Sequence, residues 1–278
     1  MNKLYKIIFL VLLLVFSMYY TDKSINLLRE LDPIMTEIKD SSKNYKIKSI
    51  NAKIDNDNII SGLSGVDIDY KKSYSKMKQY GTYNESLTTL VKVKPTISIE
   101  DNYDKFVVGG NPNNKYISFI FIINNTDNIN SLLKIISNKN IDVTFFINGN
   151  LIEDNVSLIK EISKNYYIGV YYDKYDKDIL LSSISYMNTI TNNKTNYCFC
   201  DRDNYELLNI CSSNKMHTIK TNYLINNNLY DYVKNNLSNS TIIGININKN
   251  IISELSSTID YVKSRGFKLL SVNKLIKE

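Results

Sequence analysis

Histidine is almost absent from this chain, because only His217 among its 278 residues carries an imidazole. A metal site built on two histidines is therefore excluded anywhere in the sequence. The Gly-x-Ser-x-Gly motif of serine hydrolases and the glycine-rich loops that hold phosphate are also missing. No run of lysine and arginine carries interleaved aromatic residues, so we expect no nucleic-acid partner.

The overall composition is that of a folded protein. Charged residues make up 22% of the chain and hydrophobic residues 43%, which are ordinary globular values. The length allows one main domain and a smaller additional region. A formal net charge of +6 is too small to indicate an anionic partner by itself.

A hydrophobic segment, residues 4–20, begins with Leu4 and ends with Tyr20 near the N-terminus. Lys3 and Lys6 supply a basic flank, and the final tyrosine suits a lipid headgroup region. The segment just reaches the ~17 residues that can span a bilayer. No small-residue cleavage pattern follows it. We therefore expect an uncleaved signal anchor, residues 1–20, in the cell membrane with the bulk of the chain outside; cleavage and secretion is the alternative.

Residues 21–110 are expected to form a stalk and a small α+β region of unknown role. Apolar residues recur at helical spacing over its first twenty positions: Ile25, Leu28, Leu31, Ile34 and Ile38. Further along the chain the pattern predicts, in order, a strand over 45–54, a turn near Gly62 and Gly65, a helix over 70–77 and a strand over 88–93. No chemistry is assigned to these elements.

Strands and helices alternate in residues 111–278, after a turn-forming cluster that contains Gly109 and Gly110. The apolar run 117–123 is typical of a strand buried on both faces, and Asp127 is a good N-cap for the helix that follows. Another strand is expected over 143–147. A helix over 252–262 is followed by Gly266 at its C-terminal cap and by a strand over 267–272. Such alternation predicts a mostly parallel sheet with helices outside it.

The segment 140–149, with its Thr-Phe-Phe centre at Thr144, resembles a strand of the NodB-type polysaccharide deacetylases, carbohydrate esterase family four. Ile168-Gly169 and Gly266-Phe267 resemble later elements of that family in the same order. The resemblance covers residues 115–277. It implies an α/β fold, a distorted (β/α) barrel of the NodB deacetylase type with about seven strands, whose site lies at the C-terminal ends of the strands. The membrane anchor and the small α+β appendage precede this domain.

The functional positions of that family hold different residue types here. Its members use an aspartate base and a zinc ion, held by one aspartate and two histidines, to remove acetyl groups from sugars. The aspartate pair falls on Ile122 and Ile123, the two histidines on Tyr171 and Tyr175, and a later histidine on Asn246. Isoleucine binds neither a proton nor a cation, and a phenol is a poor zinc ligand at neutral pH. The resemblance thus implies a degenerate member that lacks the catalytic residues and the metal.

Two side-chain groups remain as candidates for other roles. Tyr171, Tyr172 and Tyr175 are candidate substrate-binding residues, because aromatic faces stack on sugar rings; simple packing is the alternative. The lone histidine is expected to be exposed or half-buried.

The three cysteines, Cys198, Cys200 and Cys211, allow buried thiols, one disulfide or a soft-metal site with Asp201 or Asp203. Cys211 is the better partner for a disulfide, since residues two apart on a strand lie near the limit for bridging.

Three functional hypotheses follow from the sequence. The first is a pseudoenzyme at the cell surface, without a cofactor, that binds cell-wall glycan or a partner protein. The second is an active polysaccharide deacetylase with a non-standard site. The third is a structural membrane scaffold that acts mainly through residues 21–110. The missing ligands favour the first over the second.

Overall fold

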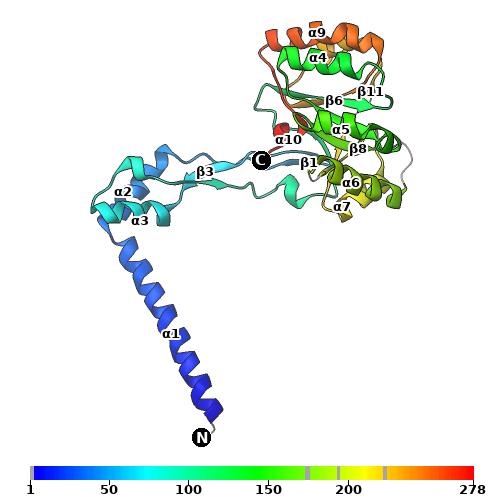
Figure 1. The fold of residues 1–278 in the computed structure, drawn as a ribbon. Helices are drawn as coiled ribbons and strands as arrows, with labels where there is room; N and C mark the ends of the chain where they lie inside the picture. The colour runs from blue at the N-terminus through cyan, green and yellow to red at the C-terminus, as the bar shows by residue number, and fades with distance from the viewer. Residues whose placement is uncertain (1–2, 173–175, 193–194, 222–223) are drawn as a thin grey trace. The chain divides into compact units, whose positions relative to one another are not determined.

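The computed structural model describes residues 3–172, 176–192, 195–221 and 224–278 (Figure 1). The chain divides into two compact units. Unit 1 contains Met1–Ser49 and Ser64–Val93, and unit 2 contains Ile50–Leu63 and Lys94–Glu278. The predicted domain boundary after residue 110 falls inside unit 2, because strands that precede it pair with strands that follow it.

Unit 1 begins with the long helix α1 (Lys3–Glu30), whose side chains are exposed along its apolar length. This helix is long and apolar enough to cross a membrane. It ends before Asp32, which caps α2 (Pro33–Ser41) by accepting a hydrogen bond of 2.9 Å from Ile34 N. Proline at the first helical position suits a new helix start. The periodic stretch 21–40 is therefore two helices rather than one.

The rest of unit 1 is a small α+β arrangement, as the sequence predicts. Helix α3 (Tyr70–Tyr80) accompanies an antiparallel pair of strands, β3 (Gly65–Ile68) and β4 (Leu90–Val93). The predicted strand 45–54 is not continuous, because residues 47 and 50 form only isolated bridges. The buried core of unit 1 is small and apolar: Ile34, Ile38, Ile68 and Met77.

Unit 2 is built on a single large sheet, whose central strands pair in the order β1-β2-β5-β12-β6-β7-β8. β10 pairs with β5 and β9, β11 with β12, and β13 with β6. The strands are β1 (Lys53–Asp55), β2 (Asn58–Ile60), β5 (Phe106–Gly109), β6 (Tyr116–Ile123), β7 (Thr144–Asn148), β8 (Tyr167–Tyr171), β9 (Tyr197–Cys200), β10 (His217–Lys220), β11 (Leu224–Ile225), β12 (Thr241–Asn246) and β13 (Lys268–Leu269).

Strands β6, β7, β8, β11 and β12 form parallel pairs, as expected for alternating strands and helices. β8 and β9 are in contact, since the Tyr167 and Tyr197 rings lie 5.2 Å apart and Asn196 N donates to Tyr167 Oη at 2.9 Å. No main-chain ladder joins β8 to β9 within the described ranges. The α/β class and parallel pairing are confirmed, whereas closure into the expected barrel is not shown by the strand pairs of the described residues.

Within the described part of unit 2, the α-helices that connect or follow these strands are α4 (Ile129–Lys139), α5 (Val156–Ser163), α6 (Lys177–Thr191), α7 (Tyr205–Ser213), α8 (Leu229–Asn236), α9 (Lys249–Ser264) and α10 (Val272–Leu275). Helices α4 and α9 lie side by side (Figure 1). Asn128, in the left-handed conformation, precedes α4, so Asp127 is not its N-cap. Gly266 adopts a φ of 79° after α9, as predicted for a C-terminal cap.

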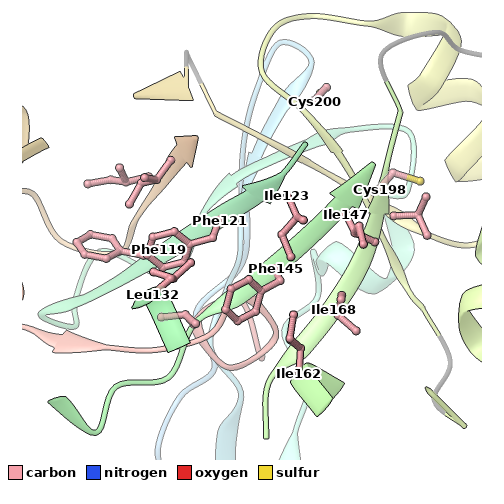
Figure 2. Packing of buried hydrophobic residues seen from close by; sticks show 14 of the residues in the cluster. Phe119, Phe121, Ile123, Leu132, Phe145, Ile147, Ile162, Ile168, Cys198 and Cys200 are labelled. Atoms are coloured by element: carbon pink, nitrogen blue, oxygen red, sulfur yellow. The ribbon is translucent and has the colours of Figure 1, made fainter. Parts of the chain in front are cut away.

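The two faces of the central strands bury two different clusters. Side chains beneath the helices form the outer cluster, part of which Figure 2 shows: it includes Phe119, Phe121, Ile123, Leu132, Phe145, Ile147, Ile162, Ile168, Cys198 and Cys200. Side chains on the opposite face form the inner cluster, which includes Val107, Ile120, Ile122, Phe146, Tyr171, Phe199, Ile219 and Val272. Both faces of β6 are buried, as its apolar sequence predicts.

Candidate functional site

The end of strand β6 holds two packed isoleucines where the resemblance expects carboxylates. Ile122 is 1% exposed and Ile123 is fully buried. Because successive strand residues alternate in direction, Ile122 enters the inner cluster and Ile123 enters the outer cluster. Neither side chain has a donor atom for a metal or a proton. These positions therefore do not fit the zinc ion that the family resemblance implies.

Aromatic rings fill the space around Ile122. The Phe146 and Phe199 rings lie 5.2 Å apart, and Tyr171 meets Phe199 edge-on at 5.7 Å. Gly169 leaves room for this arrangement, since a Cβ atom there would lie 2.7 Å from Phe146 Cε1. The inner face at this level is consequently a packed apolar core.

Two of the candidate substrate-binding tyrosines, Tyr171 and Tyr172, pack against different clusters. Tyr171 is 8% exposed and belongs to the inner cluster. Tyr172 packs against the outer cluster, and its hydroxyl donates to Asn150 Oδ1 at 2.6 Å. Tyr175 lies outside the described residues. The structure thus separates Tyr171 from Tyr172, and their binding of a sugar stays a prediction.

Asn246, at the position of a family histidine, lies in a group of asparagines that we call the amide cluster: Asn124, Asn226, Asn246 and Asn248. Asn246 Nδ2 donates to Asn226 Oδ1 at 2.7 Å, and Asn248 Nδ2 donates to the Asn226 carbonyl oxygen at 2.7 Å. Asn124 Nδ2 approaches Asn246 Oδ1 at 3.5 Å. All four side chains are exposed or half-buried. The amide cluster is a polar, uncharged surface beside the ends of β6 and β12.

Sequence reasoning identified only one member of this cluster. The sequence signal that could have identified the other members is an asparagine that directly ends or follows a strand. Asn124 follows β6 in this way, and Asn226 follows β11. In a chain this rich in asparagine the signal is weak until the strand order places the residues together. The register that aligns Asn246 with Ile122 provides that order.

The only histidine lies elsewhere, at the first residue of β10. His217 is 7% exposed, so the expectation of an exposed or half-buried ring is wrong. Its ring stacks on Tyr103 at 4.4 Å and also faces Tyr197 at 6.3 Å. Burial lowers the pKa of His217 to about 4, because desolvation disfavours the imidazolium. The rings that bury His217 come from Tyr103 and Tyr197, which are distant from it in the sequence. Its sequence neighbours therefore did not indicate this burial.

Two of the three cysteines form a disulfide, and the third is a buried thiol. Cys198 and Cys211 are bonded, with their Cα atoms 6.4 Å apart. Cys211 is thus a disulfide partner, as strand geometry favoured, and the structure shows that its partner is Cys198 rather than Cys200. Cys200 is buried, and burial raises the pKa of its thiol to about 12, which keeps it protonated and unreactive.

The disulfide removes two of the three thiols from the soft-metal alternative. Within the described part of the chain, no three His, Cys, Asp or Glu side chains form a group that could hold a metal ion.

Comparisons with known proteins agree on the fold. No protein-family profile matches the chain. Similar solved structures include wild-type BA3943 of Bacillus anthracis, described as a CE4 family pseudoenzyme (TM-score 0.65, 21% identity, 89% of this chain and 96% of that one). A BA3943 mutant with restored enzymatic activity is also similar (TM-score 0.66, 21% identity, 89% of this chain and 99% of that one). So is PdaA of Bacillus subtilis, a family 4 carbohydrate esterase (TM-score 0.53, 19% identity, 63% of this chain and 86% of that one). This chain has the family 4 carbohydrate esterase fold.

Among curated proteins, the uncharacterized YlxY of Bacillus subtilis is 30% identical over 136 residues, which are 48% of this chain. The match spans 43% of YlxY, so less than half of that protein is covered. The similarity to BA3943 covers 89% of this chain and therefore includes part of the region before residue 111, whereas the similarity to PdaA covers 63%. Part of the region before residue 111 is thus similar in structure to BA3943.

Proposed function

We propose that the protein is a membrane-tethered, non-hydrolytic binding protein that recognises cell-wall glycan on a family 4 carbohydrate esterase fold. The observation that carries this proposal is the pair Ile122 and Ile123, both packed into apolar clusters where a deacetylase needs carboxylates. Without a base or a metal-activated water, the chemical step has no proton acceptor and no nucleophile. A retained fold without its chemistry supports a binding role.

The amide cluster is the surface that we assign to the glycan. Each asparagine side chain offers both donors and an acceptor, which match the hydroxyl and acetamido groups of uncharged sugars. Asn226 and Asn246 already orient one another through their 2.7 Å hydrogen bond. Side chains that are held in place before binding lose less conformational freedom when the ligand arrives.

Helix α1 is the element that we assign to the membrane. The side chains of its apolar segment are exposed. Lys3 precedes this segment, and Lys6 lies within its first turn. A basic flank of this kind favours retention of the N-terminus on the cytoplasmic side. The Cys198–Cys211 disulfide supports placement of unit 2 in an oxidising, extracytoplasmic compartment.

Cell fractionation tests the anchor. We expect the full chain to sediment with membranes and to resist extraction by alkaline carbonate. Recovery from the culture medium with a new N-terminus near Thr21 would contradict the anchor and support cleaved secretion instead.

Sedimentation with purified peptidoglycan tests glycan binding. The full chain in detergent should co-sediment, and the double substitution Asn226→Ala with Asn246→Ala should weaken binding about tenfold, since each lost hydrogen bond contributes about 0.5–1.5 kcal/mol. Asn236→Ala, at the end of α8, is the matched control and should bind as the unchanged protein does. Equal binding by all three proteins would remove the amide cluster from the proposal.

Acetate release tests the absence of catalysis. The full chain is incubated with acetylated chitooligosaccharide or peptidoglycan, with and without added zinc or cobalt. We expect no release above the protein-free control. Metal-dependent turnover that a chelator abolishes would instead identify an active deacetylase with a non-standard site.

A further inference from the structure

Helix α1 extends beyond the segment that we assign to the membrane, because that segment ends at Tyr20 and the helix ends at Glu30. At about 1.5 Å per residue, Leu28 lies roughly 12 Å beyond Tyr20 along the helix axis. The headgroup layer on one side of a bilayer is about 5–8 Å thick. On this assignment Leu28 therefore lies in water rather than in lipid.

Two apolar side chains in this part of α1 are left exposed by their own chain. Ile25 is 48% exposed and Leu28 is 68% exposed. Arg29 contacts α3, since its guanidinium carbon lies 5.7 Å from the centre of the Tyr74 ring. The last two members of the same apolar series are instead buried in the core of unit 1: Ile34 and Ile38. Unit 1 thus meets α1 beside Ile25 and Leu28 and leaves both side chains open to a partner.

One row of side chains joins this exposed part to the apolar segment within the membrane. Counting back from Leu28 by three and four residues in turn, the positions are apolar except for one threonine: Ile7, Val11, Leu14, Met18, Thr21, Ile25 and Leu28. We call this row the α1 seam. All of its side chains are exposed. A seven-residue repeat of this kind is typical of helices that pair with a left-handed supercoil.

The residue types along the α1 seam favour a pair of parallel helices. Val11 and Ile25 are β-branched and occupy one of the two core positions of the repeat, whereas Leu14 and Leu28 occupy the other. This distribution favours two strands over three or four. The hydroxyl of Thr21 donates to the carbonyl oxygen of Ser17 at 2.8 Å, so it is satisfied within its own helix and can lie in an apolar contact.

We propose that α1 pairs in parallel with α1 of a second copy of this chain through the α1 seam; the proposal rests on the membrane placement of α1 in the proposed function. Copies inserted into one membrane share one orientation, so each seam residue meets its own counterpart and the two surfaces match in register. Lipid tails are as apolar as leucine, so the membrane part of the seam contributes close packing rather than a hydrophobic driving force. Ile25 and Leu28 contribute that driving force, because pairing removes them from water.

Cysteine cross-linking in membranes that resist alkaline carbonate extraction tests the pairing. Under mild oxidation, Ile25→Cys and Leu28→Cys should form a disulfide-linked dimer, because core positions of paired helices lie close to their counterparts. Lys23→Cys and Asn26→Cys are the matched controls on the other side of α1. They should give about fivefold less dimer, since their Cβ atoms point away from the partner helix.

The unchanged chain reports the background of this assay. Its Cys198 and Cys211 are bonded to each other, and Cys200 is buried. Equal cross-linking at all four positions would overturn the proposal, because it would indicate random collision. Absence of a dimer at Ile25→Cys and Leu28→Cys would overturn it too, and so would cross-linking of these variants to a different membrane protein.

Sedimentation equilibrium of the full chain in detergent measures the strength of the pairing. Ile25→Lys together with Leu28→Lys should raise the apparent Kd of the dimer about tenfold or more, because it places four ammonium groups in one contact. Leu27→Lys is the matched control, since Leu27 is 64% exposed but lies off the α1 seam, and it should pair as the unchanged chain does. A monomeric unchanged chain, or equal weakening by both variants, would contradict the seam. This measurement gives its result whether or not the chain fractionates with membranes or binds glycan, so failure here is distinguishable from failure of the proposed function.

Discussion

The outer and inner clusters of unit 2 lie on opposite faces of the same strands. In an active deacetylase the outer face would still be an apolar core, whereas the inner face would carry ionised catalytic groups. The outer cluster packs helices on the sheet, which any alternating α/β domain requires. The inner cluster contains Ile122, Phe146 and Phe199 at the level where a deacetylase carries ionised groups. Burying like charges without their metal costs stability, whereas apolar side chains pack well there. Apolar residues at these positions therefore make the inner face a second core beside the outer one.

The largest expected effect comes from returning a carboxylate to the inner cluster. Ile122→Asp places an unpaired acid among aromatic rings, and we expect it to lower the free energy of unfolding by about 4 kcal/mol or more. Urea denaturation of the full chain in detergent measures this change. Ile122→Val is the control and should cost about 1 kcal/mol. A loss below that of the valine variant would show that this face is open to water rather than packed.

Acid should also destabilise the inner side through His217. Its pKa is about 4 in the folded protein against 6.5 when unfolded, so the unfolded chain takes up a proton first as the pH falls. The stability contribution is complete above pH 6.5 and is lost between pH 6.5 and about 4, by about 3 kcal/mol in total. His217→Phe keeps the stacking and should flatten this part of the stability curve. An unchanged pH profile in that variant would assign the acid sensitivity to other groups.

A smaller effect is expected on the outer side from removing the disulfide. Replacing Cys198 and Cys211 together by alanine should cost about 2–3 kcal/mol, because the bond closes a short loop with a sequence separation of 13 residues. Thermal unfolding under non-reducing conditions measures the loss. Cys200→Ala, a buried thiol on the same face, should cost only about 1 kcal/mol. If the double variant were as stable as the unchanged chain, the bond would contribute nothing to this face.

The parts of the fold that depend on local pattern could be predicted from sequence. The apolar run that became β6, the Thr-Phe-Phe segment within β7 and the capping role of Gly266 were all confirmed. Each follows from residues that are neighbours in the chain. Expected strand 267–272 was wrong over most of its length, since only Lys268–Leu269 pairs with β6 and Val272 begins α10.

The amide cluster depends on residues that are distant in the chain. Asn124 and Asn246 are 122 positions apart, and Asn226 and Asn246 are 20 positions apart. No periodicity or motif connects such residues before the strand order is known. The family motif directs attention to Ile122 and Ile123 from the sequence alone, whereas no motif connects the members of the amide cluster.

The contacts of Glu278 have a consequence for how unit 2 folds. Glu278 Oε1 accepts hydrogen bonds from Gly62 N at 2.6 Å and Ile99 N at 3.2 Å, and Ser98 Oγ donates to the other carboxylate oxygen. The residues joined in this way are separated by 179 to 216 positions. A chain that emerges from the ribosome N-terminus first cannot make these contacts until Glu278 itself has emerged. Unit 2 therefore stays incomplete until that point, and its long-range closure is expected to be slow.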